Sequence, residues 1–174
     1  AFTGNVNAKM IKNLGAKYII LGHSENRANG DTDFTINKKI NSALKQKLTV
    51  IFCIGETLAQ KKRKETNRII RKQISQGLKG FKKNSKIIIA YEPVWSIGTG
   101  IIPKNQELEK NIKFIISAIS KNTKLRKIKI LYGGSVNPKN IQSLNEINML
   151  DGYLIGGASQ NAKKLIDIVR KSYN

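Results

Sequence analysis

The sequence predicts an α/β protein whose strands run parallel in one sheet. Five short apolar runs recur along the chain, and each stops at glycine or at a polar residue. Between the runs, apolar residues recur at the three- and four-residue spacing of helices that bury one face. The runs are mostly continuous rather than alternating, which is typical of strands buried on both sides. Strands and helices that alternate in this way form a parallel sheet.

The five expected strands end next to residues that carry chemistry. In chain order the strands cover residues 18–21, 50–54, 87–91, 128–132 and 153–155. The residues that follow them are Gly22-His23-Ser24, Gly55-Glu56, Glu92-Pro93, Gly133-Gly134-Ser135 and Gly156-Gly157. Parallel α/β folds bind their ligands at the carboxyl ends of the strands. We therefore expect His23, Glu92, Ser135 and the paired glycines to surround one opening.

Helices are expected between these strands. Their apolar stripes are Ile36-Ile40-Ala43-Leu44, Leu108-Ile112-Ile115-Ile116-Ile119 and Leu165-Ile168-Val169. A short helix over residues 10–14 precedes the first strand, and residues 61–74 combine a basic run with an isoleucine stripe at helical spacing. Asn137 followed by Pro138 predicts the N-cap and the first turn of a further helix.

The composition is that of one globular domain. At 174 residues, with 40% hydrophobic and 25% charged residues, the chain can bury a core of its own. No apolar run is long enough for a membrane helix, and no signal-peptide pattern is present. The single cysteine, Cys53, has no partner for an internal disulfide, which fits a reducing compartment. We expect a cytoplasmic protein.

The formal net charge of +21 raises the possibility of a polyanionic partner such as nucleic acid. The basic residues of segment 61–74 are interleaved with isoleucines at helical spacing, and no aromatic residues alternate with them to stack on bases. We interpret the charges as solvated helix faces. A basic nucleic-acid-binding protein remains the alternative from another functional class.

Glu92 and His23 are the candidates for acid–base chemistry. Glu92 follows an isoleucine-rich strand, so partial desolvation would raise its pKa and suit it to act as a general base. A salt bridge to one of the many lysines is the structural alternative for Glu92, and Glu56 competes for the same role at an equivalent strand end. His23 is the only histidine, so any imidazole chemistry must use it, although a structural role is equally open.

The two glycine pairs predict an anion site. Glycines just ahead of helical segments expose backbone N–H groups that cradle phosphate. A single Gly-Gly pair is more often a turn, but pairs on successive strands, one with Ser135, fit the phosphate site of eight-stranded α/β barrels. Cys53 is expected in the core, and neither it nor His23 has companions at metal-ligand spacing, so we expect no metal and no cofactor. Together these residues predict proton abstraction next to a carbonyl in a small phosphorylated substrate.

The segment AYEPVWSIGTG, residues 90–100, closely resembles the signature segment of the triosephosphate isomerase family. The segments LGHSENR, CIGE, YGGSV and DGYLIGGAS resemble the family's other strand-end motifs, in the same order along the chain. The resemblance runs from Phe2-Thr3-Gly4 to the last helix. It implies a (β/α)8-barrel isomerase of glycolysis and gluconeogenesis that interconverts dihydroxyacetone phosphate and glyceraldehyde 3-phosphate through an enediolate.

The resemblance also assigns roles to single residues. Glu92 matches the base, and His23 matches the neutral imidazole that polarises the carbonyl. The matching phosphate contacts are Gly98, Ser135, Gly156 and Gly157, and the matching lid and latch residues are Pro93, Val94, Trp95, Thr99, Gly100 and Tyr132. The tip Phe2-Thr3-Gly4 matches a loop that inserts into the partner subunit, so a homodimer is implied.

The sequence departs from the family pattern in several places. Ser96 stands where alanine is usual, Asn26 replaces an arginine, and Asn5 replaces a glutamate. The family's barrel has eight β/α units in about 250 residues, whereas this chain has five predicted strands. We expect it to be one partial barrel domain, residues 1–174, that holds strands 4–8. The first three units and their asparagine–lysine pair would then be absent, and these residues alone would be inactive.

Two further alternatives stay open. Another phosphate-binding barrel isomerase would share the glycine pairs, although it would not need the Glu-Pro-Val-Trp lid. A decayed gene product would keep the motifs without the activity.

Overall fold

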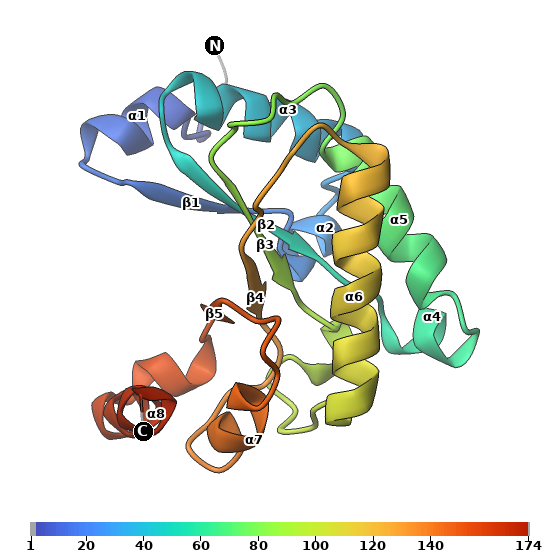
Figure 1. Ribbon diagram of the computed structural model, residues 1–174. Helices are drawn as coiled ribbons and strands as arrows, with labels where there is room; N and C mark the ends of the chain where they lie inside the picture. Colours follow the sequence, from blue (N-terminus) through green and yellow to red (C-terminus); the bar gives the residue numbers. More distant parts are fainter. Residues whose placement is uncertain (1–2, 174) are drawn as a thin grey trace.

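A five-stranded sheet forms the centre of the fold. The computed structural model describes residues 3–173. The strands are β1 (Tyr18–Leu21), β2 (Thr49–Ile54), β3 (Ile87–Tyr91), β4 (Ile130–Tyr132) and β5 (Gly152–Tyr153). They form one parallel sheet whose strand order follows the chain, as Figure 1 shows. The predicted parallel α/β fold is confirmed.

Helices occupy the connections between the strands. They are α1 (Ala8–Asn13), α2 (Ser24–Ala28), α3 (Asp33–Lys45), α4 (Leu58–Lys62), α5 (Thr66–Gly77), α6 (Asn105–Asn122), α7 (Ile141–Asn145) and α8 (Ala162–Tyr173), with 3-10 turns η1 (Val94–Ser96) and η2 (Gly157–Gln160). Helices α3, α5 and α6 pack side by side along one flank of the sheet, and α7 and α8 lie together near β4 and β5 (Figure 1). None of the helices in residues 3–173 is long and apolar enough to cross a membrane.

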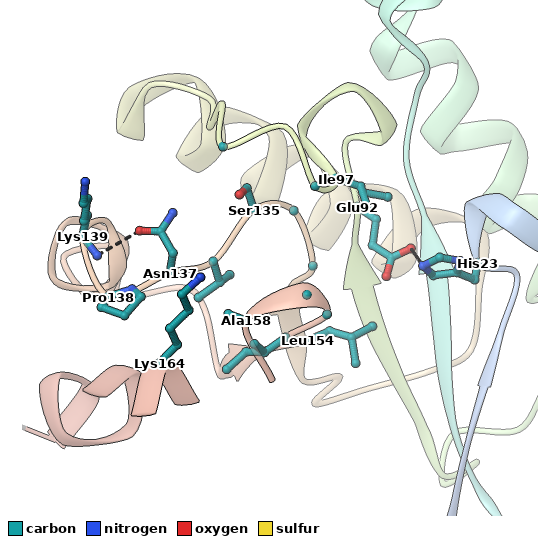
Figure 2. Close-up of a pocket in the computed structure, with 18 of the residues that line it drawn as sticks. His23, Glu92, Ile97, Ser135, Asn137, Pro138, Lys139, Leu154, Ala158 and Lys164 are labelled. Atoms are coloured by element: carbon teal, nitrogen blue, oxygen red, sulfur yellow. Dashed lines mark hydrogen bonds and ion pairs between the residues drawn. The ribbon is translucent and has the colours of Figure 1, made fainter. Parts of the chain in front are cut away.

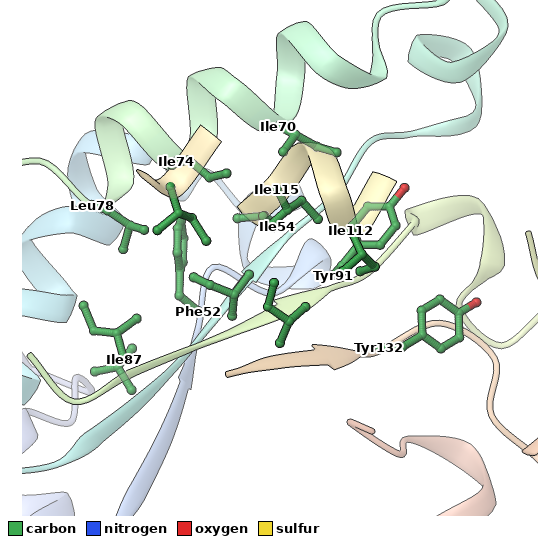
Figure 3. Close-up of a cluster of buried hydrophobic side chains, with 14 of the residues drawn as sticks. Phe52, Ile54, Ile70, Ile74, Leu78, Ile87, Tyr91, Ile112, Ile115 and Tyr132 are labelled. Atoms are coloured by element: carbon green, nitrogen blue, oxygen red, sulfur yellow. The ribbon is translucent and has the colours of Figure 1, made fainter. Parts of the chain in front are cut away.

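The hydrophobic core lies between the sheet and helices α3, α5 and α6 (Figure 3). Its fully buried side chains include Phe52, Ile54, Ile70, Ile74, Leu78, Ile112 and Ile115. Most isoleucines at the predicted helical spacing are buried, whereas Ile116 and Val169 of the predicted stripes remain 45% and 47% exposed. Each fully buried side chain contributes about 1.5–3 kcal/mol on burial, and this packing fixes the strand ends that carry the polar residues.

The basic segment 61–74 is divided between two helices. The break lies at Lys64, whose φ of 57° is left-handed. Beside it, Glu65 pairs on the surface with Arg63 at 3.0 Å and with Arg68 at 2.7 Å. Ile70 and Ile74 of α5 are buried in the core, and Arg71 and Lys72 are exposed, so the charges of this helix lie on its outer face.

The last two strands are shorter than predicted. β4 begins at Ile130 rather than at residue 128, and the side chain of Asp151 accepts the backbone N–H of Ile130 at 2.8 Å. β5 ends at Tyr153, although the N–H of Leu154 still donates to the carbonyl oxygen of Tyr132 at 2.9 Å.

The predicted helix N-cap at Asn137 is wrong. Helix α7 begins at Ile141, and Pro138 lies in the turn before it. The side chain of Asn140 accepts the N–H of Asn137, and the side chain of Asn137 accepts the N–H of Lys139, both at 2.9 Å. Asparagine side chains that bond to nearby backbone groups favour turns over helix, and here two of them delay the helix.

Both edges of the sheet are open within the described chain. β1 pairs only with β2, and β5 pairs only with β4. On β1, Tyr18 and Ile20 remain 58% and 45% exposed, although both belong to an apolar strand. An unpaired, apolar strand edge is a surface on which another strand can add.

A glycine in α5 tests the packing of the core. A Cβ atom on Gly77 would lie 2.5 Å from Cζ of the buried Phe52 ring. We expect Gly77→Ala to lower the free energy of unfolding by about 1–3 kcal/mol through overpacking, although alanine favours helix by about 1 kcal/mol over glycine. Urea unfolding measures the difference. Gln76→Ala, on the exposed face of the same helix, is the control; a Gly77→Ala variant as stable as this control would contradict the packing.

Candidate active site

One pocket lies at the carboxyl ends of the strands. Its volume is about 700 Å³. The predicted site residues that line it are His23, Glu92, Gly98, Gly100, Ser135, Gly156 and Gly157 (Figure 2). They come from segments that follow β1, β3, β4 and β5, so the parallel topology brings together residues far apart in the sequence. Apolar side chains, among them Ile97 and Leu154, complete the lining.

Glu92 directly follows β3 and is almost completely buried, with 3% of its surface exposed. Its backbone N–H donates to the carbonyl oxygen of Ile54 at 2.8 Å, which fixes the start of the side chain. A Cβ atom on Gly133 would lie 2.6 Å from Cγ of Glu92, so glycine is required at that position. Burial raises the pKa of Glu92, although the nearby His23 acts in the opposite direction.

The Oε2 atom of Glu92 is buried and makes no hydrogen bond within residues 3–173. The basic group nearest to it is the Nε2 atom of His23, at 3.9 Å (Figure 2). No lysine of the described residues pairs with Glu92, so the alternative of a lysine salt bridge is wrong. A buried carboxylate oxygen without a partner is free to accept a proton from a bound molecule.

His23 is the N-cap of helix α2. Its Nδ1 atom accepts the backbone N–H of Glu25 at 3.3 Å. Since Nδ1 is an acceptor there, the neutral ring carries its proton on Nε2. That is the nitrogen that faces Glu92. The structural and the chemical role of His23 are therefore compatible, because each uses a different ring nitrogen.

Glu56, the competing carboxylate, has a different environment. It is completely buried and does not line the pocket. Its carboxylate accepts the indole N–H of Trp95 at 2.9 Å and the hydroxyl of Tyr91 at 3.1 Å. Burial raises the pKa of Glu56, and these hydrogen bonds oppose the rise. With both oxygens engaged, Glu56 anchors Trp95 rather than a ligand.

The segment 93–100, which we call the lid, starts from this anchor. Val94 N–H donates to the carbonyl oxygen of Glu56 at 3.0 Å, and the Nζ atom of Lys61 lies 3.7 Å from the centre of the Trp95 ring. Gly98 and Gly100 have φ values of 69° and 77°, which favour glycine. These two glycines reach the pocket. Four other predicted lid residues do not line it: Pro93, Val94, Trp95 and Thr99.

Ser135, Gly156 and Gly157 form the far side of the pocket. The Ser135 hydroxyl makes no hydrogen bond within the described chain, and Gly157 opens the 3-10 turn η2. Tyr132, the predicted latch, is buried behind this wall. Its hydroxyl lies 2.9 Å from Oγ of Ser96, and burial raises its pKa to about 12, so the phenol stays protonated.

Two charged residues of the pocket were missed by the sequence analysis. Lys139 and Lys164 line the end of the pocket away from Glu92 (Figure 2). Neither ammonium group forms an ion pair with another described residue. The adjacent Lys163 does not line the pocket. Lys163 and Lys164 differ only in the direction in which each side chain leaves helix α8. The sequence alone does not show which of the two points towards the pocket.

Cys53 and the other metal-binding residue types do not form a metal site here. Within residues 3–173, no group of three or more histidine, cysteine, aspartate and glutamate side chains is placed to hold a metal ion. Cys53 is buried in β2, and burial raises the pKa of its thiol, which therefore stays neutral.

Comparisons with known proteins agree with this arrangement. The family model described as triosephosphate isomerase matches residues 1–172. Curated proteins named triosephosphate isomerase are similar over almost the whole chain. Those of Geotalea uraniireducens and Dictyoglomus turgidum are each 43% identical, covering 99% and 98% of this chain and 71% of their own length. That of Mycoplasma mobile is 42% identical, covering 98% of this chain and 69% of its own length.

The raised pKa of Glu92 predicts a pH-dependent stability. A carboxyl group whose pKa is higher in the folded state opposes folding once it ionises, so its penalty is absent below the unfolded pKa, near 4.5, and grows as the pH rises. We expect Glu92→Gln to stabilise the chain at pH 8, by about 1.4 kcal/mol for each unit of pKa elevation, and to have little effect at pH 4. Urea unfolding at both values measures this.

The control for this experiment is Glu25→Gln, because the side chain of Glu25 is 84% exposed. It should change the free energy of unfolding little at either pH. If Glu92→Gln and the unmodified chain had the same free energy of unfolding at pH 8, burial of the ionised carboxylate would not destabilise the fold, and the prediction would be wrong.

Proposed function

Because this chain belongs to the triosephosphate isomerase family, we propose that it supplies the acid–base residues and the phosphate cradle for interconverting dihydroxyacetone phosphate and glyceraldehyde 3-phosphate, a reaction of glycolysis. One observation carries the proposal. The unpaired carboxylate oxygen of Glu92 and Nε2 of His23 lie 3.9 Å apart in one pocket. Ser135 and the glycine pair at 156–157 line the same pocket.

Glu92 is the proposed base. Ionised Glu92 takes a proton from the carbon next to the substrate carbonyl, and the electron pair of that C–H bond moves towards the carbonyl to form an enediolate. Glu92 then returns the proton to the former carbonyl carbon, while the proton of the neighbouring hydroxyl group passes to the former carbonyl oxygen, so that the neighbouring carbon becomes the new carbonyl. Its burial supports this role, because a raised pKa makes the carboxylate a stronger base. The apolar lining of the pocket keeps water from competing for the proton.

His23 is the proposed electrophile. Its Nε2–H group donates a hydrogen bond to the carbonyl oxygen and stabilises the negative charge that develops there. The bond between Nδ1 and the backbone N–H of Glu25 supports a neutral ring, since a doubly protonated ring cannot accept it. A neutral imidazole donor also avoids an ion pair with Glu92 that would weaken the base.

The phosphate group is proposed to lie at the other side of the pocket. Backbone N–H groups of Gly98, Gly156 and Gly157 and the free hydroxyl of Ser135 are its proposed donors. Lys139 and Lys164 supply positive charge on this side. The separation of the phosphate from the acid–base pair places the three-carbon part of the substrate between them.

The five strands are proposed to correspond to strands 4–8 of an eight-stranded barrel. The open edges of the sheet and the strand order along the chain support this assignment. Residues 1–174 would then be one partial barrel domain of a cytoplasmic enzyme, and full activity would need three further β/α units. The proposed dimer contact at the tip 2–4 is supported by the exposed turn at Thr3 and Gly4; Phe2 lies outside the described residues.

In the complete protein, Glu92→Gln should lower kcat by about 10²–10⁴-fold, the range typical of a positioned general base. KM should change little, because the phosphate donors are intact. A coupled assay of triose phosphate turnover measures both constants. Glu25→Gln is the control on an exposed carboxylate. An unchanged kcat for Glu92→Gln would remove Glu92 from the base role, and near-complete turnover by residues 1–174 alone would contradict the need for further units.

Lys164→Ala should weaken the binding of inorganic phosphate to this chain. Loss of one charge at the pocket, partly screened by solvent, is expected to raise the Kd by about two- to fivefold at low salt, and less at high salt. Isothermal titration calorimetry measures the Kd. Lys163→Ala is the matched control, because it removes the same charge from the same helix outside the pocket. Equal Kd values for the two variants would exclude a local role for Lys164.

A further inference from the structure

Ser96 is a buried hydroxyl at the junction of the lid and the phosphate side of the pocket. It ends the 3-10 turn η1 and has no exposed surface. Its Oγ atom lies 2.6 Å from the carbonyl oxygen of Ile101, 2.9 Å from the hydroxyl of Tyr132 and 3.2 Å from the backbone nitrogen of Ser135. One side chain thus contacts three separate segments.

The direction of each hydrogen bond follows from chemistry. A serine hydroxyl has one proton to donate and two lone pairs that accept. The carbonyl of Ile101 can only accept, so the proton of Ser96 goes there. The N–H of Ser135 can only donate, and it takes one lone pair. The hydroxyl of Tyr132 must therefore donate to the other lone pair, and the hydrogen-bonding capacity of Ser96 is completely used.

The partners depend on Ser96 in turn. Within the described residues, neither the carbonyl of Ile101, the hydroxyl of Tyr132 nor the N–H of Ser135 has another hydrogen-bond partner. The neighbouring Gly134 also maintains this arrangement, because a Cβ atom there would collide with both the Tyr132 hydroxyl and Oγ of Ser96. The network therefore leaves no room for a side chain at position 134 and no free lone pair on Ser96 for another donor.

The lid is itself a bonded unit. The hydroxyl of Thr99 lies 3.2 Å from the carbonyl oxygens of Trp95 and Ser96, and it accepts the N–H of Ile101 at 3.2 Å. Ser96 closes the same unit through its bond to Ile101. Ser96 thus belongs to the same hydrogen-bonded segment as Thr99 and Ile101, and Gly98 lies within that segment.

We propose that Ser96 is a positioning residue that couples occupation of the phosphate cradle at Ser135 to the position of the lid. The inference rests on the proposed function, since it assumes that an anion occupies the cradle. An anion that attracts the Ser135 loop moves one partner of Ser96, and the shared hydroxyl transmits that movement to Trp95 and Gly98. An alanine at position 96 would leave the cradle in place and separate it from the lid.

Trp95 provides a direct readout, because it is the only tryptophan and precedes Ser96 in the lid. Its indole contacts Glu56 and Lys61, so lid displacement should change its fluorescence. Residues 1–174 would be titrated with inorganic phosphate, with calorimetry reporting binding and fluorescence reporting the lid. The unmodified chain should bind phosphate with a change in Trp95 emission.

In Ser96→Ala, phosphate should still bind, with a Kd within about tenfold of the unmodified chain, since only one of the three hydrogen bonds of Ser96 reaches the cradle, at the N–H of Ser135. The Trp95 response at saturating phosphate should fall by at least half. Ser75→Ala is the matched control: it removes a serine hydroxyl from α5 that bonds only to Lys72, and it should keep the full response.

Each other outcome has a defined meaning. A full Trp95 response in Ser96→Ala, or phosphate binding without any response in the unmodified chain, overturns the coupling and leaves the proposed function intact. Absence of phosphate binding to the unmodified chain overturns the cradle and the coupling together. If circular dichroism shows that Ser96→Ala is unfolded, Ser96→Cys decides instead, because it keeps a side chain of similar shape and replaces the hydroxyl with a thiol, which is a weak donor and a weak acceptor. A full response in that variant would overturn the inference.

Discussion

The buried carboxylate of Glu92 sets the requirements for the residues around it. Burying an ionised carboxylate costs free energy, and the cost is larger when one of its oxygens makes no hydrogen bond, as at Oε2 of Glu92. The side chain keeps this position because the surrounding strands hold it. β3 is paired on both sides, and the N–H of Glu92 extends the ladder to Ile54. Gly133 on the next segment leaves the space that the side chain fills. Core burial along β3 thus provides the free energy that offsets an unfavourable group.

Glu56 and Glu92 show how two carboxylates at equivalent strand ends acquire different roles. Both are buried, and burial raises the pKa of each. Both carboxylate oxygens of Glu56 accept hydrogen bonds, one from the indole of Trp95 and one from the hydroxyl of Tyr91, so Glu56 holds the lid in place. Glu92 has an unsatisfied oxygen that faces the pocket. Availability of a lone pair, more than burial or position along the strand, separates the structural acid from the candidate base.

The sequence predicted the strand ends well because continuous apolar runs and their glycine terminators are local signals. It therefore placed His23, Glu92 and Ser135 at one edge of the sheet. It failed at Asn137, where two asparagine side chains favour a turn, since helix-start rules do not distinguish a cap from a turn. Ser96 was noted only as a departure from the family pattern, because its partners lie at Ile101, Tyr132 and Ser135. Tertiary contacts of this kind leave no periodicity to detect.

The effect of the net charge of +21 on a bound anion depends on how far each charge lies from the pocket. At physiological salt, the field of an exposed charge falls off within about 8 Å, so most surface lysines do not act on an anion already bound in the pocket. They act earlier, by attracting an anionic molecule from solution and raising its rate of encounter. Once the anion is bound, the relevant cations are those that line the pocket, Lys139 and Lys164. A strongly basic surface and a small phosphorylated substrate are thus physically consistent, and no nucleic-acid partner is needed to explain the charge.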